Sequence, residues 1–171
     1  MKSFKKLVGV GMVLTMVAAL FAGCGKKSEK VFYIGGSGPL TGGAAAYGIG
    51  VKNGAELAVK EINEAGGING IKIKFSYEDD EADPEKAVNA YNILKDKGMN
   101  IMMGTVTSGA CAGVIEKTYA DGMFQRTPSA SSTDVLKLGN VFQVCFTDPA
   151  QGILAADYIA EKGLAKKIAI I

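Results

Sequence analysis

Residues 34–84 contain the pattern that most constrains the fold, because they read as one strand–helix–strand unit. An apolar strand ends in a turn rich in glycine, serine and threonine. An amphipathic helix and a second strand follow. A connection of helix length joins parallel strands, and the small residues of the turn leave room for a ligand beside backbone N–H groups. The unit therefore predicts a parallel α/β sheet with a binding crevice at its carboxyl edge.

The same alternation of strands and helices continues along the chain. Short connections and helical crossovers predict a doubly wound parallel α/β sheet with a Rossmann-like order. The helices are predicted at 44–65, from the Asp83-Pro84 pair onward, at 108–121 and at 148–163. The strands are predicted at 31–34, 71–77 (a sheet edge), 101–104, 123–125 and 141–144, with the start of a further strand at 164–171.

The first 23 residues read as a targeting segment. Three lysines precede an apolar run at 7–22, whose ~16 residues suit a signal peptide and fall short of the ~20 that span a membrane. Small residues stand before Cys24, and this pattern resembles a lipobox, in which the cysteine carries a lipid anchor. Residues 24–30 then form a polar tether. An ordinary cleaved signal and an uncleaved anchor are the alternatives.

Composition excludes several classes of function. The chain has no histidine, which removes Ser–His catalysis and histidine–metal sites. Three of the 19 basic and none of the 17 acidic residues lie in 1–23, so the remainder is nearly neutral and has no basic, aromatic patch for nucleic acid. The acidic run at 78–81 lacks the spacing of a calcium loop and is expected to be a solvated strand end, so no metal site is predicted.

The glycine-rich turn at 35–43 does not match a nucleotide-binding loop. Thr41 stands where the dinucleotide fingerprint needs a third glycine, and Ala44 replaces the lysine of a phosphate loop. Pro39 also removes an N–H group that such a loop would use. We find no catalytic nucleophile or cofactor motif. We therefore expect a protein that binds a ligand, carries no cofactor and catalyses no reaction.

Two further loops are expected at the same edge of the sheet. Residues 104–109 follow a central strand and begin a helix, where free N–H groups and the positive helix end suit a carboxylate. Residues 127–132, with three serines, also follow a strand. Each loop could instead only cap its own helix, and the residues alone leave both interpretations open.

The element order and several motifs resemble one family. The motifs are PLTG, the following YG, NGAELAVKEIN, GGINGIKI and the DD ahead of DP. They are similar to extracellular amino-acid receptors, the periplasmic binding proteins of type I, in the leucine/isoleucine/valine-binding group of ABC-importer subunits. The resemblance implies two lobes, with lobe one at 31–147 and the start of lobe two at 148–171. The family is more than twice as long, so a fragment or truncated reading frame is expected, with apolar surface left exposed.

The resemblance also assigns roles to individual residues. Ser108 is expected to bind the α-carboxylate of the ligand, and Tyr47 to line the pocket near the ligand side chain. The run Ser129, Ala130 and Ser131 is expected to offer backbone groups, with an added hydroxyl at Ser131. A second tyrosine and a glutamate for the ligand ammonium would come from the other lobe, outside this sequence.

Two cysteines besides Cys24 remain to be placed. Some family members have a disulfide between the positions of Ala82 and Thr107, which cannot form here. Cys111 and Cys145 could pair in an oxidising compartment, or they could stay as two buried thiols. The sequence does not supply the geometry that would decide between these states.

Together these expectations describe an exported receptor, anchored to the outer face of the membrane by lipid on Cys24. It would deliver a leucine-, isoleucine- or valine-like amino acid to ABC permease subunits by lobe closure. The nearest alternative is a receptor of the same fold for amides, urea or another small carboxylate ligand. A remote one is an exported flavodoxin-like enzyme. A DNA-binding regulator would need a helix-turn-helix where the signal segment lies.

Overall fold

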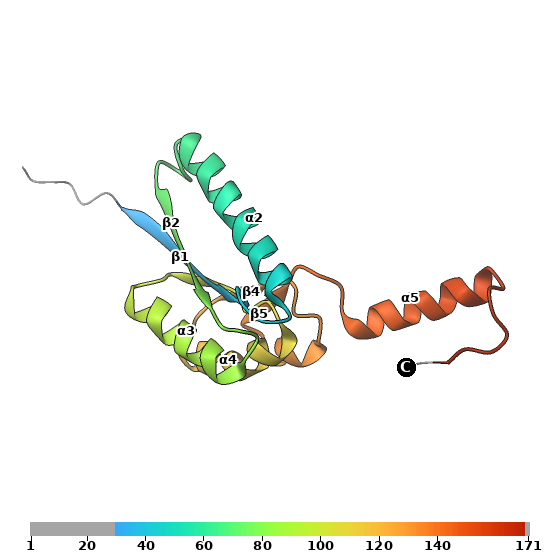
Figure 1. The fold of residues 1–171 in the computed structure, drawn as a ribbon. Helices are drawn as coiled ribbons and strands as arrows, with labels where there is room; N and C mark the ends of the chain where they lie inside the picture. The colour runs from blue at the N-terminus through green and yellow to red at the C-terminus, as the bar shows by residue number, and fades with distance from the viewer. Residues whose placement is uncertain (1–29, 170–171) are drawn as a thin grey trace, which may run out of the picture.

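The computed structural model describes residues 30–169 as a five-stranded parallel sheet with helices on both faces and a helical arm (Figure 1). The doubly wound parallel α/β prediction is confirmed. The predicted signal segment and Cys24 lie outside the described residues. The elements are β1 (Val31–Gly38), α2 (Ala45–Glu64), β2 (Lys72–Asp79), α3 (Pro84–Asp96), β3 (Ile101–Met103), α4 (Ser108–Ala120), β4 (Gln125–Thr127), the 3-10 helix η1 (Thr133–Leu136), β5 (Val141–Gln143) and α5 (Asp148–Glu161).

The strand order β2-β1-β3-β4-β5 creates one switch point. From β1 the chain turns to one side to form β2 and then crosses back to form β3. Because such crossovers are right-handed, α2 lies on one face of the sheet, and α3 and α4 lie on the other (Figure 1). The loops after β1 and β3 diverge at this point, where open α/β sheets bind their ligands. The edge position predicted for the second strand is confirmed.

The main core lies between the sheet and the α3–α4 pair. The capping of α3 is as predicted, because the Asp83 carboxylate accepts hydrogen bonds from the N–H groups of Glu85 and Lys86. A smaller cluster lies under α4 and η1. The main core contains Tyr33, Ala87, Tyr91, Leu94, Met99, Met102, Ala110 and Val114, and the smaller cluster contains Cys111, Ile115, Ala130, Val135 and Val141.

The opposite face of the sheet is only partly covered. Phe142 is in register with Arg126, and its ring stacks on Phe124 with 5.1 Å between the ring centroids. Phe124 is 42% and Phe142 51% exposed. Exposed apolar surface was predicted for this chain, and the described residues show it.

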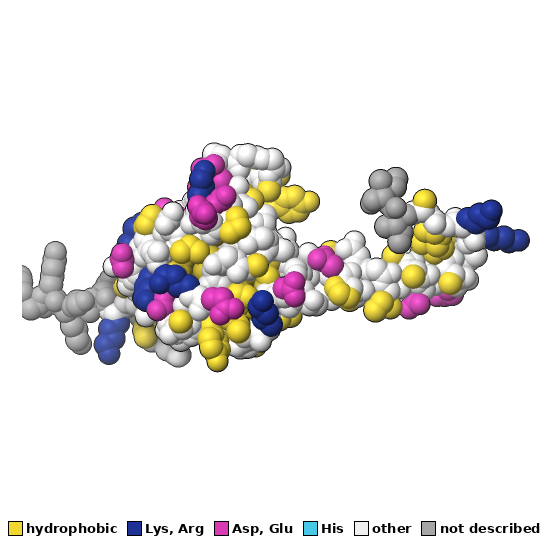
Figure 2. Space-filling view, turned by 90° about the horizontal axis from the view of Figure 1, so that it is seen from below, with side chains coloured by type: hydrophobic (Ala, Val, Ile, Leu, Met, Phe, Trp, Pro, Cys, Tyr) yellow, Lys and Arg dark blue, Asp and Glu magenta, His cyan; other side chains and the backbone are white. Residues whose placement is uncertain are grey.

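Helix α5 extends away from the sheet as an arm (Figure 1). None of its residues is buried, and hydrophobic side chains such as Ile153, Leu154 and Tyr158 are exposed along it (Figure 2). The strand predicted at 164–171 is not formed in the described residues 164–169. A strand needs a neighbour for its hydrogen bonds, and no described strand lies beside this segment. Within 30–169, no helix has the length and apolar character needed to cross a membrane.

Three predicted strand boundaries were wrong, and one of them is the end of β2, which lies at Asp79 and not at residue 77. Strand β1 continues to Gly38 because it pairs with β2 along its whole length, so the turn begins only at Pro39. The strand predicted at 123–125 lies at 125–127, in register with β5. Helix α5 begins at Asp148, as predicted, and its cap is Thr147, whose hydroxyl accepts the hydrogen bond from the N–H of Ala150 at 3.3 Å.

Candidate functional site

A groove of about 230 Å³ opens at the carboxyl edge of the sheet, at the switch point between β1 and β3. One side, here named the tyrosine wall, is the segment after β1 with Ala44 and Tyr47. The other side, the serine wall, comes from the loops after β3 and β4, and its residues are Val106, Thr107, Ser108, Ser129 and Ser131. The structure thus brings together the two serine-containing loops predicted at this edge and the start of α2, which follows the glycine-rich turn.

Ser108 is the first residue of α4, and its side chain links the two loops of the serine wall. Its Oγ accepts hydrogen bonds from the N–H groups of Ser131 at 3.1 Å and Ser132 at 3.3 Å. A hydroxyl oxygen has two acceptor positions and one proton. Because both acceptor positions are occupied, the proton of Ser108 remains to be donated to another group. The hydroxyl is therefore prepared to donate a hydrogen bond to an anion in the groove.

The N-terminus of α4 adds to this preference for an anion. The first turn contains no acidic residue, and the cap residue Thr107 makes no side-chain hydrogen bond to the helix. Thr107 Oγ1 is buried and has no partner among the described residues. The positive end of the helix dipole and its free N–H groups therefore face the groove with no acidic side chain in the first turn of the helix.

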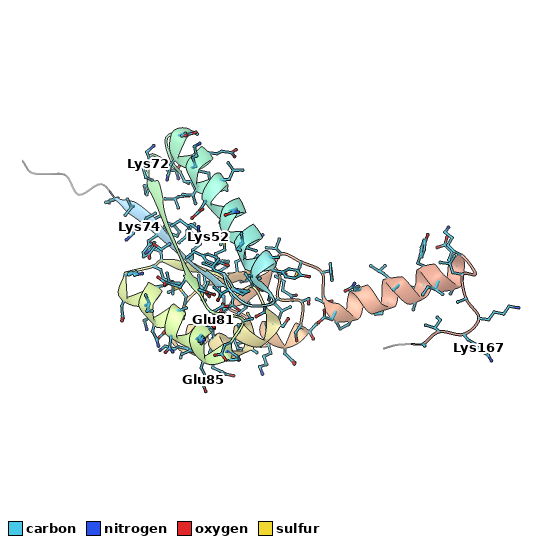
Figure 3. All side chains as sticks on the ribbon, in the orientation of Figure 1. Lys52, Lys72, Lys74, Glu81, Glu85 and Lys167 are labelled. Atoms are coloured by element: carbon cyan, nitrogen blue, oxygen red, sulfur yellow. The ribbon has the colours of Figure 1, made fainter. Side chains whose placement is uncertain are left out.

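Charged side chains lie elsewhere on the molecule. The seven described residues that line the groove are all uncharged. Lys72 and Lys74 lie near the amino end of the edge strand β2, and Glu85 points outward from α3 (Figure 3). The groove therefore favours an anion through dipoles and hydroxyls rather than through a lysine or arginine.

The two other predicted serines lie in the groove, with one difference from expectation. Ser129 and Ser131 both line it. The N–H group of Ser131, which was expected to face the ligand, instead donates to Ser108 Oγ. The hydroxyl of Ser131 is thus the group of this residue that is left for a ligand.

Ala130 lies behind the groove and not on its surface. It is fully buried and packs in the cluster under α4. Its N–H donates to Thr127 Oγ1 at 3.1 Å, and its carbonyl accepts a hydrogen bond from Gln143 Nε2 at 2.5 Å. Both backbone groups are therefore used to hold the loop.

Two buried polar side chains support the serine wall, and neither was predicted from the sequence. Gln125 Nε2 donates to the carbonyl of Gly104 at 2.8 Å, while its Oε1 accepts from Thr118 Oγ1 at 2.8 Å. Thr127 Oγ1 donates to the carbonyl of Thr105 at 2.7 Å. The partners are far apart in the sequence, so no local pattern could have revealed them. They satisfy loop carbonyls that would otherwise be buried without a donor.

The tyrosine wall is connected to the end of β2 by Asp79. Its carboxylate accepts hydrogen bonds from Leu40 N at 2.8 Å, Thr41 Oγ1 at 2.7 Å and Glu81 N at 2.9 Å. Burial opposes ionisation of the carboxyl, but these hydrogen bonds outweigh it and lower the pKa of Asp79 below its ordinary value. The side chain therefore stays charged at neutral pH.

The expectation that residues 78–81 form a solvated strand end was wrong for its central pair. Asp79 is half-buried, and Asp80 is fully buried. Burial raises the pKa of Asp80, whose Oδ1 accepts from the N–H of Ala82 at 3.0 Å. Glu81 is exposed as expected, whereas Glu78 is half-buried, and both glutamates pair with lysines. Among residues 30–169, no group of three or more Cys, Asp and Glu side chains could hold a metal ion.

The two described cysteines are free thiols in the structure. Cys111 is buried beside Gln125, whose Nε2 lies 3.4 Å from its sulfur, and burial raises the pKa of Cys111 to about 11. Cys145 is half-buried, and its Sγ lies 3.5 Å from the carbonyl oxygen of Ala130. The disulfide that the sequence left open is not formed.

Comparison with known proteins now adds to this geometry. The family model described as periplasmic binding protein matches residues 31–171. The Leu/Ile/Val-binding protein homolog 3 of Brucella melitensis biotype 1 is 39% identical over 140 residues, or 81% of this chain and 38% of that protein. The Leu/Ile/Val-binding protein BraC3 of Rhizobium johnstonii is 40% identical over 140 residues, with the same two coverages.

A solved structure shows the same fold. The branched-chain amino acid transporter substrate binding protein LivJ from Streptococcus pneumoniae, in complex with isoleucine, superposes with a TM-score of 0.73 at 32% identity. The match covers 78% of this chain and 39% of that one. The chain thus spans well under half the length of the relatives it matches. It belongs to the periplasmic binding protein family, with the type I fold that its sequence predicts.

Proposed function

We propose that the complete protein is the solute-binding subunit of an ABC importer, that it binds a branched-chain or other small amino acid between two lobes, and that it catalyses no reaction. One observation carries the proposal. The hydroxyl of Ser108 has both acceptor positions occupied and stands at the N-terminus of α4, in a groove lined by uncharged residues. Such a site suits a ligand carboxylate.

In this arrangement the two walls would contact different parts of the ligand. The carboxylate would lie against the serine wall, where Ser108, the Ser131 hydroxyl and the free N–H groups of α4 donate hydrogen bonds. The ligand side chain would lie toward Tyr47 on the tyrosine wall. Groups for the ammonium would come from the second lobe, which closes over the ligand. The isoleucine in the S. pneumoniae relative supports an amino acid of this size.

The same proposal covers the remaining parts of the chain. Residues 31–147 would form lobe one and 148–171 the start of lobe two, which agrees with a helix α5 that has no buried residue. Residues 1–23 would be a lipoprotein signal peptide, and 24–30 a tether from lipid-modified Cys24. The partners would be the membrane and the permease subunits of the importer.

Substitution of Ser108 tests the carboxylate site. In the full-length protein, Ser108→Ala removes a hydrogen bond to a charged group, worth roughly 1.5–3 kcal/mol, so the Kd for leucine should rise by about 10- to 100-fold. Ser76→Ala is a matched control, because Ser76 is a half-buried serine of β2 outside the groove. Titration calorimetry measures both variants. An unchanged Kd for Ser108→Ala would contradict the assignment.

A further inference from the structure

We infer that Asp79 is a positioning residue of the binding groove: by holding the loop after β1 it fixes Tyr47, and it thereby sets which ligand side chains the groove prefers. The inference rests on the proposed function, because it concerns the ligand of the same groove. Asp79 does not line the groove itself. It acts through the loop.

Asp79 binds this loop through both of its carboxylate oxygens. Oδ1 accepts the Leu40 N–H at 2.8 Å, and Oδ2 accepts the Thr41 hydroxyl at 2.7 Å. With both oxygens engaged, the carboxylate fixes the position and the orientation of the loop. Among the described residues, Asp79 provides the only side chain from outside residues 39–47 that hydrogen-bonds to this segment.

The position of the loop is transmitted directly to Tyr47. The Ala45 N–H donates to the carbonyl of Gly42, and the Tyr47 N–H donates to that of Ala44, so two turn hydrogen bonds connect the loop to α2. Gly48 packs so closely against Pro39 that an added Cβ would lie 1.9 Å from the proline carbonyl oxygen. The loop and the first turn of α2 therefore move together.

Other means of fixing this segment are weak. The cap residue of α2 is Ala44, which offers no side-chain hydrogen bond, and the first turn contains no acidic residue. The side chain of Tyr47 is 66% exposed, so packing does little to determine where it stands. Helix α2 is anchored at its far end by Asn63, which hydrogen-bonds to both backbone groups of Ile73. At its start, Tyr47 follows the backbone that Asp79 holds.

Loss of the Asp79 carboxylate should therefore affect ligands unequally. The carboxylate site on the serine wall keeps its own hydrogen bonds, which do not include Asp79. Only the wall beside the ligand side chain is released. A ligand with a large side chain, such as leucine, should lose more affinity than alanine. Simple destabilisation of the fold would weaken both ligands by the same factor.

The test uses the full-length protein and compares Kd values for leucine and alanine by titration calorimetry. Asp79→Ala is expected to lower the preference for leucine over alanine by about fivefold or more. Asp79→Asn, which keeps an acceptor for Leu40, should restore most of it. Glu78→Gln is the matched control, since Glu78 pairs with Lys97 at 2.6 Å and does not hold the loop. An unchanged preference, or an equal loss for both ligands, would overturn the inference.

A second measurement needs no ligand. Hydrogen exchange of the Leu40 amide should be faster in Asp79→Ala than in the parent or in Glu78→Gln, because the amide loses its acceptor. Equal exchange would overturn the inference. If Asp79→Ala does not fold, Thr41→Val removes one of the two hydrogen bonds and should shift the preference in the same direction by less. If the parent protein binds no amino acid, the proposed function fails, and the exchange result still decides whether Asp79 fixes the loop.

Discussion

The serine wall and the tyrosine wall face each other across the same groove, but they are held in place in different ways. Buried side chains hold the serine wall from behind, with Thr127 and Gln125 both fully buried and hydrogen-bonded to loop carbonyls. The tyrosine wall is held from its edge by Asp79, and Tyr47 stands 66% exposed.

The difference suggests how one groove can bind a group that all its ligands share and still discriminate between their side chains. All α-amino acids share a carboxylate, and a rigid wall can recognise it with fixed donors. Side chains differ between ligands, and a wall held by few contacts can change without disturbing the fold. Stability should therefore depend on the serine wall, and ligand preference on the tyrosine wall. Gly48 is the exception, because its close contact with Pro39 joins the start of α2 to the loop that Asp79 holds.

The largest effect is expected at this exception. Gly48→Ala places a Cβ 1.9 Å from the Pro39 carbonyl oxygen, and backbone must move to relieve the clash. We expect a loss of about 3 kcal/mol in the free energy of unfolding, measured by urea denaturation. Gly50→Ala is the matched control, because a Cβ there meets nothing within 4 Å. It should stabilise α2 by about 0.5–1 kcal/mol. Equal stability of the two variants would contradict the close contact.

A smaller effect is expected from the serine wall. Thr127→Val keeps the shape of the side chain but removes the hydrogen bonds to the Thr105 carbonyl and from the Ala130 N–H. Both backbone groups are then left without these partners, so the free energy of unfolding should fall by roughly 2 kcal/mol. Thr133→Val, at an exposed position, should change it by less than about 0.5 kcal/mol. Similar values for the two variants would show that the buried network does not hold the wall.

The sequence predicted most of the fold because its signals are local. The cap residue Asp83 predicted the start of α3, and the glycines after α2 and α4 predicted the ends of these helices to within about a residue. The apolar runs gave the central strands. Predicted strand boundaries were wrong where pairing with a neighbouring strand determines the ends of a strand. An example is β4, which pairs with β5 from Gln125 onward and not from the apolar Met123.

The candidate site was predicted in part for the same reason. Loops that follow parallel strands must meet at one edge, so the loops with Ser108, Ser129 and Ser131 could be placed together. Tyr47 was placed beside them only by the family resemblance. The burial of Ala130 and the hydrogen bonds of Asp79 depend on contacts between distant segments. Contacts between segments that are distant in the sequence leave no periodic pattern or motif in it. They became visible only in three dimensions.

The smallest effect on stability is expected at Tyr47. Because its side chain is 66% exposed, Tyr47→Ala should change the free energy of unfolding by less than about 0.5 kcal/mol. It should nevertheless weaken leucine more than alanine in the full-length protein, since the wall beside the ligand side chain is lost. Tyr119→Ala, another exposed tyrosine but outside the groove, should alter neither. Equal weakening of both ligands would place Tyr47 outside the side-chain pocket.

The central claim is that the groove recognises a carboxylate, and replacing that group on the ligand tests it most directly. Leucine and leucinamide have the same side chain and amine, but leucinamide carries a neutral amide in place of the carboxylate. Titration calorimetry on the full-length protein should find that leucine binds and that leucinamide binds at least about 100-fold more weakly. Equal affinities, or a preference for leucinamide, would contradict the account.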